Sequence, residues 1–507
     1  MTPRWLPTLP ELFFIAVLLW LFAAGDGWSV LLADGDTGWH IRNGERILAC
    51  ACFPRADPFA IGTAGHLWFS WEWLTDVLYA LLHRMAGLKA VVFFSGAVIA
   101  ATFAVVLRHC LWRGANPLVA LPVVLLATGA SSLHFLARPH VLTLLLLAVC
   151  AWALDRDRRE PTPWVWGLPL LVALWCNLHG GFLALFPMLA AVFLEACFEA
   201  RGRARRYAWL TALCALATCV NPYGWRLHLH VLAYLQSDWI RNSIQEFQSP
   251  QFRSEGLLQF EMLLALGLVL WPGLARRRRW AGCGLLLFWG HQALGSARHV
   301  PIYCVTAAPY ISSELEACWA RWSNRTGRAA LGQVLRRAGA EWRAWTTGFS
   351  SAPALLCGVL LMFPWGQRWP ADFPANKFPS AIVNRNWGLL GGAPGQPAAV
   401  FSSDQWSDYL IYRRYPALRV FFDGRSDFFA VWRGPAYSRL LQGSPGCVEL
   451  LKPAGVRLAL VPVEWPLAGL LATRSDWKPV DRDFQAILFE RVDAPRDTPK
   501  LAAPNSR

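Results

Sequence analysis

The sequence predicts a polytopic α-helical membrane protein of about 11 transmembrane helices, followed by a C-terminal soluble α/β domain. Between residues 10 and 370, apolar runs of about 15 to 20 residues alternate with short polar turns. The chain is 55% hydrophobic and only 16% charged, whereas about a quarter of the residues in a soluble protein are charged. The 29 Trp residues also suit a protein with many lipid–water boundaries, where Trp is enriched.

The polar turns belong to two chemical classes that alternate along the chain. One class is rich in arginine and comprises residues 108–113, 156–159, 201–206, 276–279 and 321–343. The other carries Asp, His, Asn and aromatic residues and comprises residues 34–36, 134–140, 177–179, 221–222 and 298–299. Because Lys and Arg near helix ends remain cytoplasmic, we expect the second class on the outer face. The net charge of +15 therefore reflects orientation in the membrane, and we expect no nucleic-acid partner.

The predicted spans follow from the apolar runs in chain order. A run at about 12–32 resembles a secretory signal but exceeds the usual length, so we expect an uncleaved helix with a cytoplasmic N-terminus. A first outer loop, 33–88, follows, and its segment 71–84 fits an amphipathic helix lying in the interface. Ten further spans are expected at 89–107, 117–133, 140–154, 163–178, 181–198, 207–221, 257–274, 280–296, 300–315 and 350–367. This odd count places the C-terminus outside the cytoplasm.

The composition changes near residue 370, which divides the chain into a membrane domain, 1–368, and an extracytoplasmic domain, 369–507. Short β-rich runs alternate there with helical patterns, which indicates a small α/β domain with a mixed sheet. We expect strands at 399–401, 418–422, 458–463 and 485–489, and helices at 406–414, 432–442 and 447–453.

The 13 Cys residues lack the spacing of a metal site, and most lie inside apolar runs. We interpret these as buried small hydrophobic residues. Cys50 and Cys52 are the only close pair outside the predicted spans, and we expect neither a disulfide nor a metal role for them. The chain also lacks the phosphate-binding, dinucleotide-binding and hydrolase motifs GxxxxGK[ST], GxGxxG, GxSxG and HExxH in a suitable context, which argues against nucleotide-driven pumps and common hydrolases.

Asp34 and Asp36 are the first candidates for catalysis. Ionisable residues at a membrane boundary are costly and are functional candidates for that reason. One carboxylate could deprotonate a hydroxyl, or the pair could hold Mg²⁺ or Mn²⁺ together with phosphate oxygens. A purely structural alternative is that these acidic residues cap the helix that follows.

The other outer turns supply donors and positive charge that could bind a phosphate group. Arginine is especially suitable, since its planar fork makes bidentate contacts with phosphate. The candidate binding residues are His40, Arg138, His140, Asn177, His179, Arg298 and His299, with Glu72 and Glu246 as possible further members. Each histidine taken alone fits a structural role as well.

Short polar and aromatic motifs follow one another along most of the chain: Asp34-Gly-Asp-Thr-Gly-Trp-His40, Asp57-Pro-Phe59, Trp71-Glu-Trp-Leu74, Arg138-Pro-His140, Asn177-Leu-His-Gly-Gly181, Asn221-Pro222 and Phe421-Phe-Asp-Gly-Arg425. This ordered set resembles that of a bacterial group of uncharacterised proteins similar to the GT-C superfamily of membrane glycosyltransferases. That superfamily includes oligosaccharyltransferases, protein O-mannosyltransferases and lipid A aminoarabinose transferases. The resemblance covers most of the chain, and the ordered set of motifs is fairly specific to that group. The chain lacks a WWDYG-like motif, which argues against protein N-glycosylation.

The resemblance implies transfer of a sugar from a polyprenyl-phosphate donor to an envelope glycan, lipid or protein acceptor. The reaction would occur at the outer face of the bacterial cytoplasmic membrane, with inversion and with Asp34 or Asp36 as base or metal ligand. A transporter or flippase of a lipid-linked saccharide is the first alternative, although transport sites usually lie near the middle of the membrane. A non-catalytic membrane scaffold is the second.

Overall fold

The computed structural model describes residues 6–23, 27–199, 201–253, 257–323, 330–362, 369–393 and 395–492. The chain forms two compact units. The first comprises Met1–Arg55 and Phe69–Pro374, and the second comprises Ala56–Trp68 and Ala375–Arg507. The short segment Ala56–Trp68 thus leaves the predicted first outer loop and belongs to the C-terminal unit.

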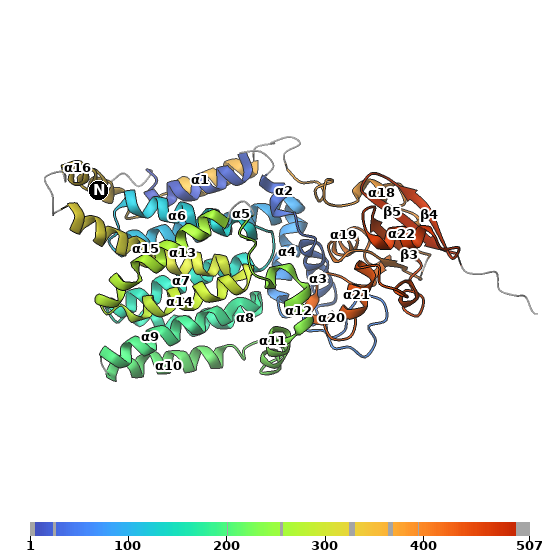
Figure 1. Ribbon diagram of the computed structural model, residues 1–507, viewed down its shortest axis with the longest axis horizontal. Helices are drawn as coiled ribbons and strands as arrows, with labels where there is room; N and C mark the ends of the chain where they lie inside the picture. Colours follow the sequence, from blue (N-terminus) through green and yellow to red (C-terminus); the bar gives the residue numbers. More distant parts are fainter. Residues whose placement is uncertain are drawn as a thin grey trace, which may run out of the picture. The chain divides into compact units, whose positions relative to one another are not determined.

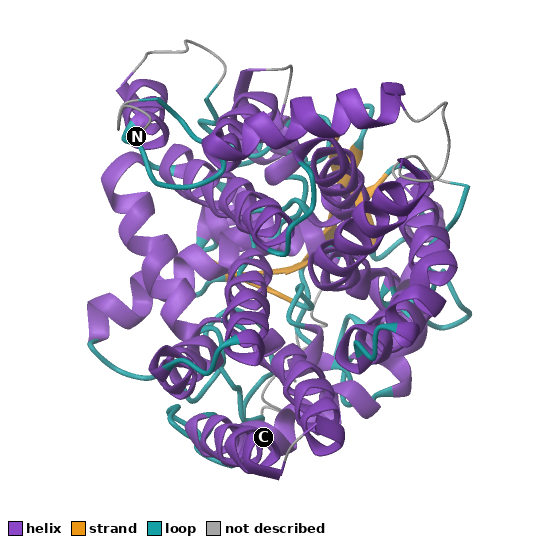
Figure 2. Ribbon diagram, turned by 90° about the vertical axis from the view of Figure 1, so that its left-hand side faces the viewer, coloured by secondary structure: helices purple, strands orange, loops and turns teal. Residues whose placement is uncertain are grey.

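The first unit is a helical bundle, in which α13 packs against α14 and α15 (Figure 1) and many helices are seen nearly end-on in Figure 2. A helix occurs at each of the eleven predicted spans. These helices are α1 (Leu9–Ala23), α5 (Leu88–Trp112), α6 (Pro117–Ser131), α7 (His140–Arg159), α8 (Leu168–Leu178), α9 (Leu185–Glu199), α10 (Arg201–Ala217), α13 (Leu257–Arg276), α14 (Trp280–Gly295), α15 (Val300–Ser323) and α17 (Ala352–Met362). The end of the last predicted span, 363–367, lies outside the described residues.

Not every one of these helices has the length of a membrane span. Within the described ranges, four helical stretches are long and apolar enough to cross a membrane: Leu88–Trp112, Pro117–His134, Gly180–Glu199 and Leu257–Arg276. Leu9–Phe22 and Pro163–Leu178 are apolar but shorter. The first predicted span is also not one continuous helix, because α1 ends at Ala23 and α2 (Gly27–Leu31) begins separately.

Two helices of the predicted first outer loop, α3 (Asp36–Cys50) and α4 (Trp73–Ala86), pack closely against each other. The predicted amphipathic helix is therefore present as α4, which buries Thr75, Asp76 and Tyr79. Gly44 permits the close approach, since a Cβ atom there would lie 1.9 Å from the backbone oxygen of Asp76. After α3, Cys50 and Cys52 form a disulfide, so our expectation of unpaired cysteines was wrong at this position.

Short elements complete the polar turns of the first unit. They are η1 (Ser132–His134), η3 (Gly180–Ala184), α11 (Arg226–Gln236), α12 (Asp238–Ser243), η4 (Gln245–Phe247), η5 (Ala297–His299) and α16 (Ala330–Glu341). The turns containing η4 and η5 are joined, because the backbone N–H of Ala297 donates to the carbonyl of Gln248 at 2.9 Å.

The second unit contains a mixed sheet, as predicted, but with five strands where four were expected. Its order is β2-β1-β3-β5-β4, with β1 parallel to β2 and β3, and β5 antiparallel to β3 and β4. The strands are β1 (Ala398–Phe401), β2 (Leu418–Val420), β3 (Leu458–Pro462), β4 (Trp477–Arg482) and β5 (Ala486–Arg491). The helices are α18 (Ser380–Arg385), α19 (Asp404–Arg414), α20 (Ser426–Phe429), α21 (Gly434–Leu441) and α22 (Pro466–Ala472).

Two local predictions for this unit were wrong. The helix expected at 447–453 is only the short turn η10 (Val448–Leu450). Strand β4 was missed because it is an edge strand whose side chains are mostly exposed, so it lacks the apolar alternation of a half-buried strand.

The segment Ala56–Trp68 extends this sheet beyond β2. The backbone N–H of Val420 donates to the carbonyl of Phe59 at 3.0 Å, and the N–H of Ile61 donates to the carbonyl of Val420 at 2.9 Å. A buried ion-pair cluster fixes the same segment, since the Arg425 guanidinium lies 2.7 Å from Asp57 Oδ1 and 2.6 Å from Asp423 Oδ2. A segment of the predicted first outer loop is therefore an integral part of the C-terminal unit.

Candidate active site

Two polar turns that are distant in sequence are joined by backbone contacts. The N–H of Ala137 donates to the carbonyl of Leu31 at 2.7 Å, and Thr37 Oγ1 donates to the carbonyl of Ala137 at 2.8 Å. These bonds hold the start of α3 against the turn that precedes α7. As a result, Asp34 and Asp36 lie next to Arg138.

The Arg138 guanidinium contacts three carboxylates. Its Nη1 lies 2.9 Å from Asp34 Oδ2 and 2.7 Å from Glu246 Oε1, and its Nη2 lies 2.7 Å from Asp36 Oδ2. The guanidinium thus uses both of its terminal nitrogens. Asp34 and Asp36 from one turn, Arg138 from a second and Glu246 from a third therefore form one cluster, which we call the Arg138 cluster.

The charges of the Arg138 cluster do not balance when all three carboxylates are ionised. Burial raises the pKa of Asp34 to about 7; Arg138 opposes this shift, while Asp36 adds to it. Burial is the largest single influence on Glu246 and disfavours its ionised form, but the combined attraction of Arg138, His134, Arg298 and His140 outweighs burial and lowers the net pKa of that carboxyl. Asp34 is therefore the member that can gain or lose a proton near neutral pH.

The contacts of Asp34 and Asp36 are compatible with both roles considered from the sequence, the helix-capping role and the catalytic role. Asp34 Oδ1 accepts a hydrogen bond from the backbone N–H of Asp36 at 2.9 Å, which is the expected contact of an acidic residue at a helix start. Its other oxygen faces Arg138. Asp36 Oδ1 is buried and has no hydrogen-bond partner among the described residues, so it could accept a bond from a donor such as a substrate hydroxyl.

A second group of polar side chains connects α3, α4 and the turn after α8. Glu72 Oε2 lies 3.6 Å from His40 Nε2, and Glu72 Oε1 lies 3.4 Å from His179 Nε2. His40 Nδ1 lies 2.5 Å from Asp76 Oδ1. Burial disfavours protonation of His40, but the nearby carboxylates, Asp76 first, raise its net pKa. The carboxylates around His40 therefore favour its protonated form.

The hydrogen bonds of His179 define its tautomer. Its Nδ1 accepts a bond from the backbone N–H of Gly181 at 2.9 Å and contacts Thr143 Oγ1 at 2.8 Å. Nε2 must then carry the proton of the neutral ring, and it points to Glu72. Gly181 is required here, because a Cβ atom would lie 2.6 Å from Thr143 Oγ1.

The remaining predicted residues have more varied surroundings. Arg298 donates to the Tyr234 hydroxyl at 3.1 Å and lies over the Phe247 ring, next to the residue Glu246. The His140 ring is 6.4 Å from that of His179, and His140 Nε2 donates to the carbonyl of His134 at 2.7 Å.

Asn177 and His299 have contacts typical of structural residues. The Asn177 carbonyl oxygen accepts a bond from Trp73 Nε1 at 2.7 Å, and its amide donates to the carbonyl of Val220 at 2.8 Å. His299 Nδ1 donates to the carbonyl of Gln292 at 3.3 Å. Among the described residues, no hydrogen bond or ion pair joins either side chain to the Arg138 cluster.

Sequence analysis did not select Asp76, Asn43 or Thr143, although all three hold candidate residues in place. Asn43 donates to Asp76 Oδ2 at 2.6 Å, so the carboxylate that contacts His40 is itself fixed. An acidic residue on the buried face of the amphipathic helix 71–84 was the available signal for Asp76. Thr143 had none, because it lies inside an apolar run.

The metal site considered from the sequence is not preformed by these side chains. In the described part of the chain, no group of three or more His, Cys, Asp and Glu residues could hold a metal ion. The Arg138 guanidinium lies between the carboxylates, where a bridging cation would be expected. We therefore derive no step through a metal.

No protein-family model matches the chain, and no curated protein matches it either. Solved structures do match. The apo oligosaccharyltransferase of Archaeoglobus fulgidus aligns with a TM-score of 0.59 at 12% identity, over 90% of this chain and 69% of that chain. The archaeal oligosaccharyltransferase AglB from the same organism, in complex with an inhibitory peptide and a dolichol-phosphate, aligns with a TM-score of 0.55 at 11% identity and the same coverage.

ArnT from Cupriavidus metallidurans bound to undecaprenyl phosphate aligns with a TM-score of 0.48 at 14% identity, over 97% of this chain and 99% of that chain. The two archaeal structures show that this chain has a GT-C-like fold. The fold expected from the ordered motifs is thereby confirmed.

Proposed function

We propose that this protein is a membrane glycosyltransferase that transfers a sugar from a polyprenyl-phosphate-linked donor to an acceptor hydroxyl. The observation that carries the proposal is the Arg138 cluster, in which Asp34, Asp36 and Glu246 surround one guanidinium on a GT-C-like fold. A fold does not determine a reaction, so the named side chains must account for the chemistry.

Asp34 is the proposed general base. The acceptor oxygen attacks the anomeric carbon and loses its proton to the Asp34 carboxylate. In the same step, the bond between the anomeric carbon and the phosphate oxygen breaks, and the polyprenyl phosphate leaves with the electron pair. A single displacement of this kind inverts the anomeric configuration. A base with a pKa of about 7 is well matched to proton transfer near neutral pH.

Positive charge near the carboxylates would stabilise the departing phosphate. Arg138 and Arg298 are always charged, and the raised pKa of His40 favours its charged form. The neutral His179 ring adds an N–H donor at Nε2. Preorganised donors and charges are usually the largest catalytic term for such a leaving group. A lipid-linked donor suits this site because soluble nucleotide sugars are cytoplasmic, whereas we place the reaction on the outer face.

Two observations support the outer location. The Arg138 cluster is built from the turns that lack arginine runs, and the arginine-rich turns mark the cytoplasmic side. The Cys50–Cys52 disulfide closes the end of α3, and disulfides form mainly in oxidising, non-cytoplasmic compartments.

Lipid profiling of a deletion strain tests the proposed reaction. The strain should accumulate a polyprenyl-phosphate sugar, because its consumption is blocked. A plasmid copy of the native chain should remove the accumulated lipid, and a copy with Asp34→Asn and Asp36→Asn should not, at equal membrane abundance. Full complementation by the double variant would contradict a catalytic role and favour the scaffold alternative. Accumulation of the saccharide lipid only on the cytoplasmic leaflet would favour a flippase.

A further inference from the structure

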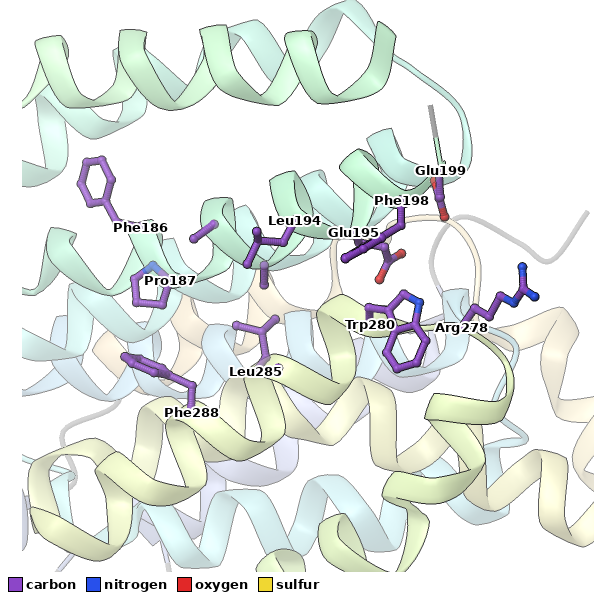
Figure 3. A pocket seen from close by; sticks show the side chains of 13 residues that line it. Phe186, Pro187, Leu194, Glu195, Phe198, Glu199, Arg278, Trp280, Leu285 and Phe288 are labelled. Carbon is purple, nitrogen blue, oxygen red and sulfur yellow. The ribbon is translucent and has the colours of Figure 1, made fainter. Parts of the chain in front are cut away.

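A second feature of the first unit lies away from the Arg138 cluster. An open groove of about 1350 Å³ runs between α9 and α14. In Figure 3, Leu194 of α9 faces Leu285 of α14 near the middle, with Pro187 and Phe288 toward one end. The volume exceeds the roughly 300 to 1,000 Å³ of common small-molecule pockets. An open apolar groove of this size suits a long, flexible chain better than a compact metabolite.

The dimensions of the groove match one leaflet of a membrane. Helix α9 rises roughly 17 Å between Pro187 and Phe198, since an α-helix rises about 1.5 Å per residue. Half of a hydrocarbon core about 30 Å thick is roughly 15 Å. Leu194 and Phe198 are exposed, as expected for side chains that contact hydrocarbon. A single acyl chain from one leaflet can therefore extend along the groove.

The two ends of the groove differ in polarity. Arg278, Trp280, Glu195 and Glu199 gather at the end opposite Phe288 (Figure 3). Both carboxylates have cationic partners, because Arg158 pairs with Glu195 and Arg203 lies 3.1 Å from Glu199. The Arg278 side chain has no recorded partner among the described residues and belongs to a run of four arginines. This end is therefore cationic, and Trp280 is suited to the lipid–water boundary.

We infer that the groove between α9 and α14 binds an anionic glycerophospholipid of the leaflet on the arginine-rich side. Its phosphate lies at Arg278, and one acyl chain fills the space between Leu194 and Leu285. The site is separate from the proposed donor site, because Arg278 belongs to an arginine-rich turn and the Arg138 cluster belongs to the opposite class of turns.

Gly284 provides a direct way to block the groove. It lines the groove, and an added Cβ atom would meet nothing within 4 Å. Gly284→Leu should therefore fill the space without a clash, and it removes a glycine from a helix interior. Gly358→Leu is the matched control, since Gly358 lies in α17 and also has open space around it.

Native mass spectrometry of the full chain, reconstituted with phosphatidylglycerol, phosphatidylcholine or undecaprenyl phosphate, tests the inference. The native chain and Gly358→Leu should retain phosphatidylglycerol, and Gly284→Leu should lose one bound molecule. Arg278→Gln should lower the preference for phosphatidylglycerol over phosphatidylcholine by about fivefold, the effect of one arginine near an anionic surface. Arg276→Gln, a neighbouring arginine outside the groove lining, should leave that preference unchanged.

Three results would overturn the inference. Equal phosphatidylglycerol retention in Gly284→Leu and the native chain would show that the groove holds no lipid. Displacement of phosphatidylglycerol by undecaprenyl phosphate in the native chain, but not in Gly284→Leu, would assign the groove to a polyprenyl lipid. A dimer that is lost in Gly284→Leu would assign it to a second copy of the chain.

Discussion

Arg138 Nη1 lies 2.9 Å from Asp34 Oδ2, although the two residues are more than one hundred positions apart in the sequence. The contact joins the two turns that flank α3 and α7, and it places a proton-accepting group beside a permanent positive charge. In the proposed reaction, Asp34 would receive the proton of the acceptor hydroxyl, and Arg138 would stabilise the departing phosphate. Each prediction below tests one consequence of this arrangement.

The pH dependence of transfer should report Asp34. The pKa of this carboxyl is raised to about 7, so the base becomes ionised, and turnover increases, as pH rises through about 7. Its contribution to stability has the opposite sign: it is fully present below the ordinary aspartate range and is lost as pH rises through about 7.

A rate–pH profile tests this assignment. Asp34→Asn should remove the rise near pH 7, whereas Asp238→Asn, at a highly exposed position, should preserve it. An unchanged rise in Asp34→Asn would assign the titration to another group.

The geometry of the Arg138 fork should matter as well as its charge. Arg138→Lys keeps the positive charge, but lysine has one terminal nitrogen in place of the two in the planar guanidinium. It therefore cannot contact the three carboxylates and a phosphate at the same time. Loss of one charged hydrogen bond, about 1.5 to 3 kcal/mol, should lower turnover about 10- to 100-fold. Steady-state kinetics at matched membrane abundance measures the effect, with Arg241→Lys, an exposed ion-pair residue, as control. Native turnover in Arg138→Lys would contradict the proposed role.

Chelation should leave transfer intact. We expect turnover to be unchanged by EDTA, because Arg138 already supplies the positive charge between Asp34 and Asp36. Activity assays after dialysis against EDTA, with and without added Mg²⁺ or Mn²⁺, provide the measurement. Loss of activity that either metal restores would show that the aspartates act as metal ligands instead.

Arg425 should stabilise the C-terminal unit and not act in the reaction. It forms buried ion pairs with Asp57 and Asp423, and removal of one partner from a buried pair costs about 3 to 5 kcal/mol. Arg425→Ala should therefore lower the melting temperature of the domain and the membrane abundance of the chain. Arg419→Ala changes an exposed arginine of β2 and is the control. Reduced turnover at normal abundance and melting temperature would indicate a functional role instead.

The alternation of apolar runs and polar turns was sufficient to predict a helix at each of the eleven spans of the first unit, but not the additional helices α11, α12 and α16 between them. Each span had a long local signal, and arginines marked one set of turns. Helix boundaries were less predictable, because α7 and α15 continue several residues beyond their apolar runs into polar sequence. The number of membrane-spanning helices also does not follow from the number of helices, because only four helical stretches among the described residues are long and apolar enough to cross a membrane.

The arrangement of the candidate site was only partly predictable. Asp34, Asp36 and Arg138 could be selected because each interrupts apolar sequence at an outer turn. Their contact with one another depends on tertiary bonds such as Ala137 to Leu31, which leave no trace in local sequence. The segment Ala56–Trp68 joins the sheet of the second unit through one parallel bridge between Ala60 and Val420 and is also held by the ion pair of Asp57 with Arg425. The bridge is too short to produce a periodic pattern, and the ion pair links residues that are far apart in the sequence.

Single-turnover transfer with the polyprenyl-phosphate sugar isolated from the deletion strain tests the central claim most directly. Purified native chain should release polyprenyl phosphate and glycosylate its acceptor. The double variant Asp34→Asn, Asp36→Asn, which nearly preserves side-chain size, should be slower by about 10² to 10⁴, the range of general acid–base catalysis. Equal release rates for the native chain and a correctly folded double variant would contradict a glycosyltransferase site at the Arg138 cluster.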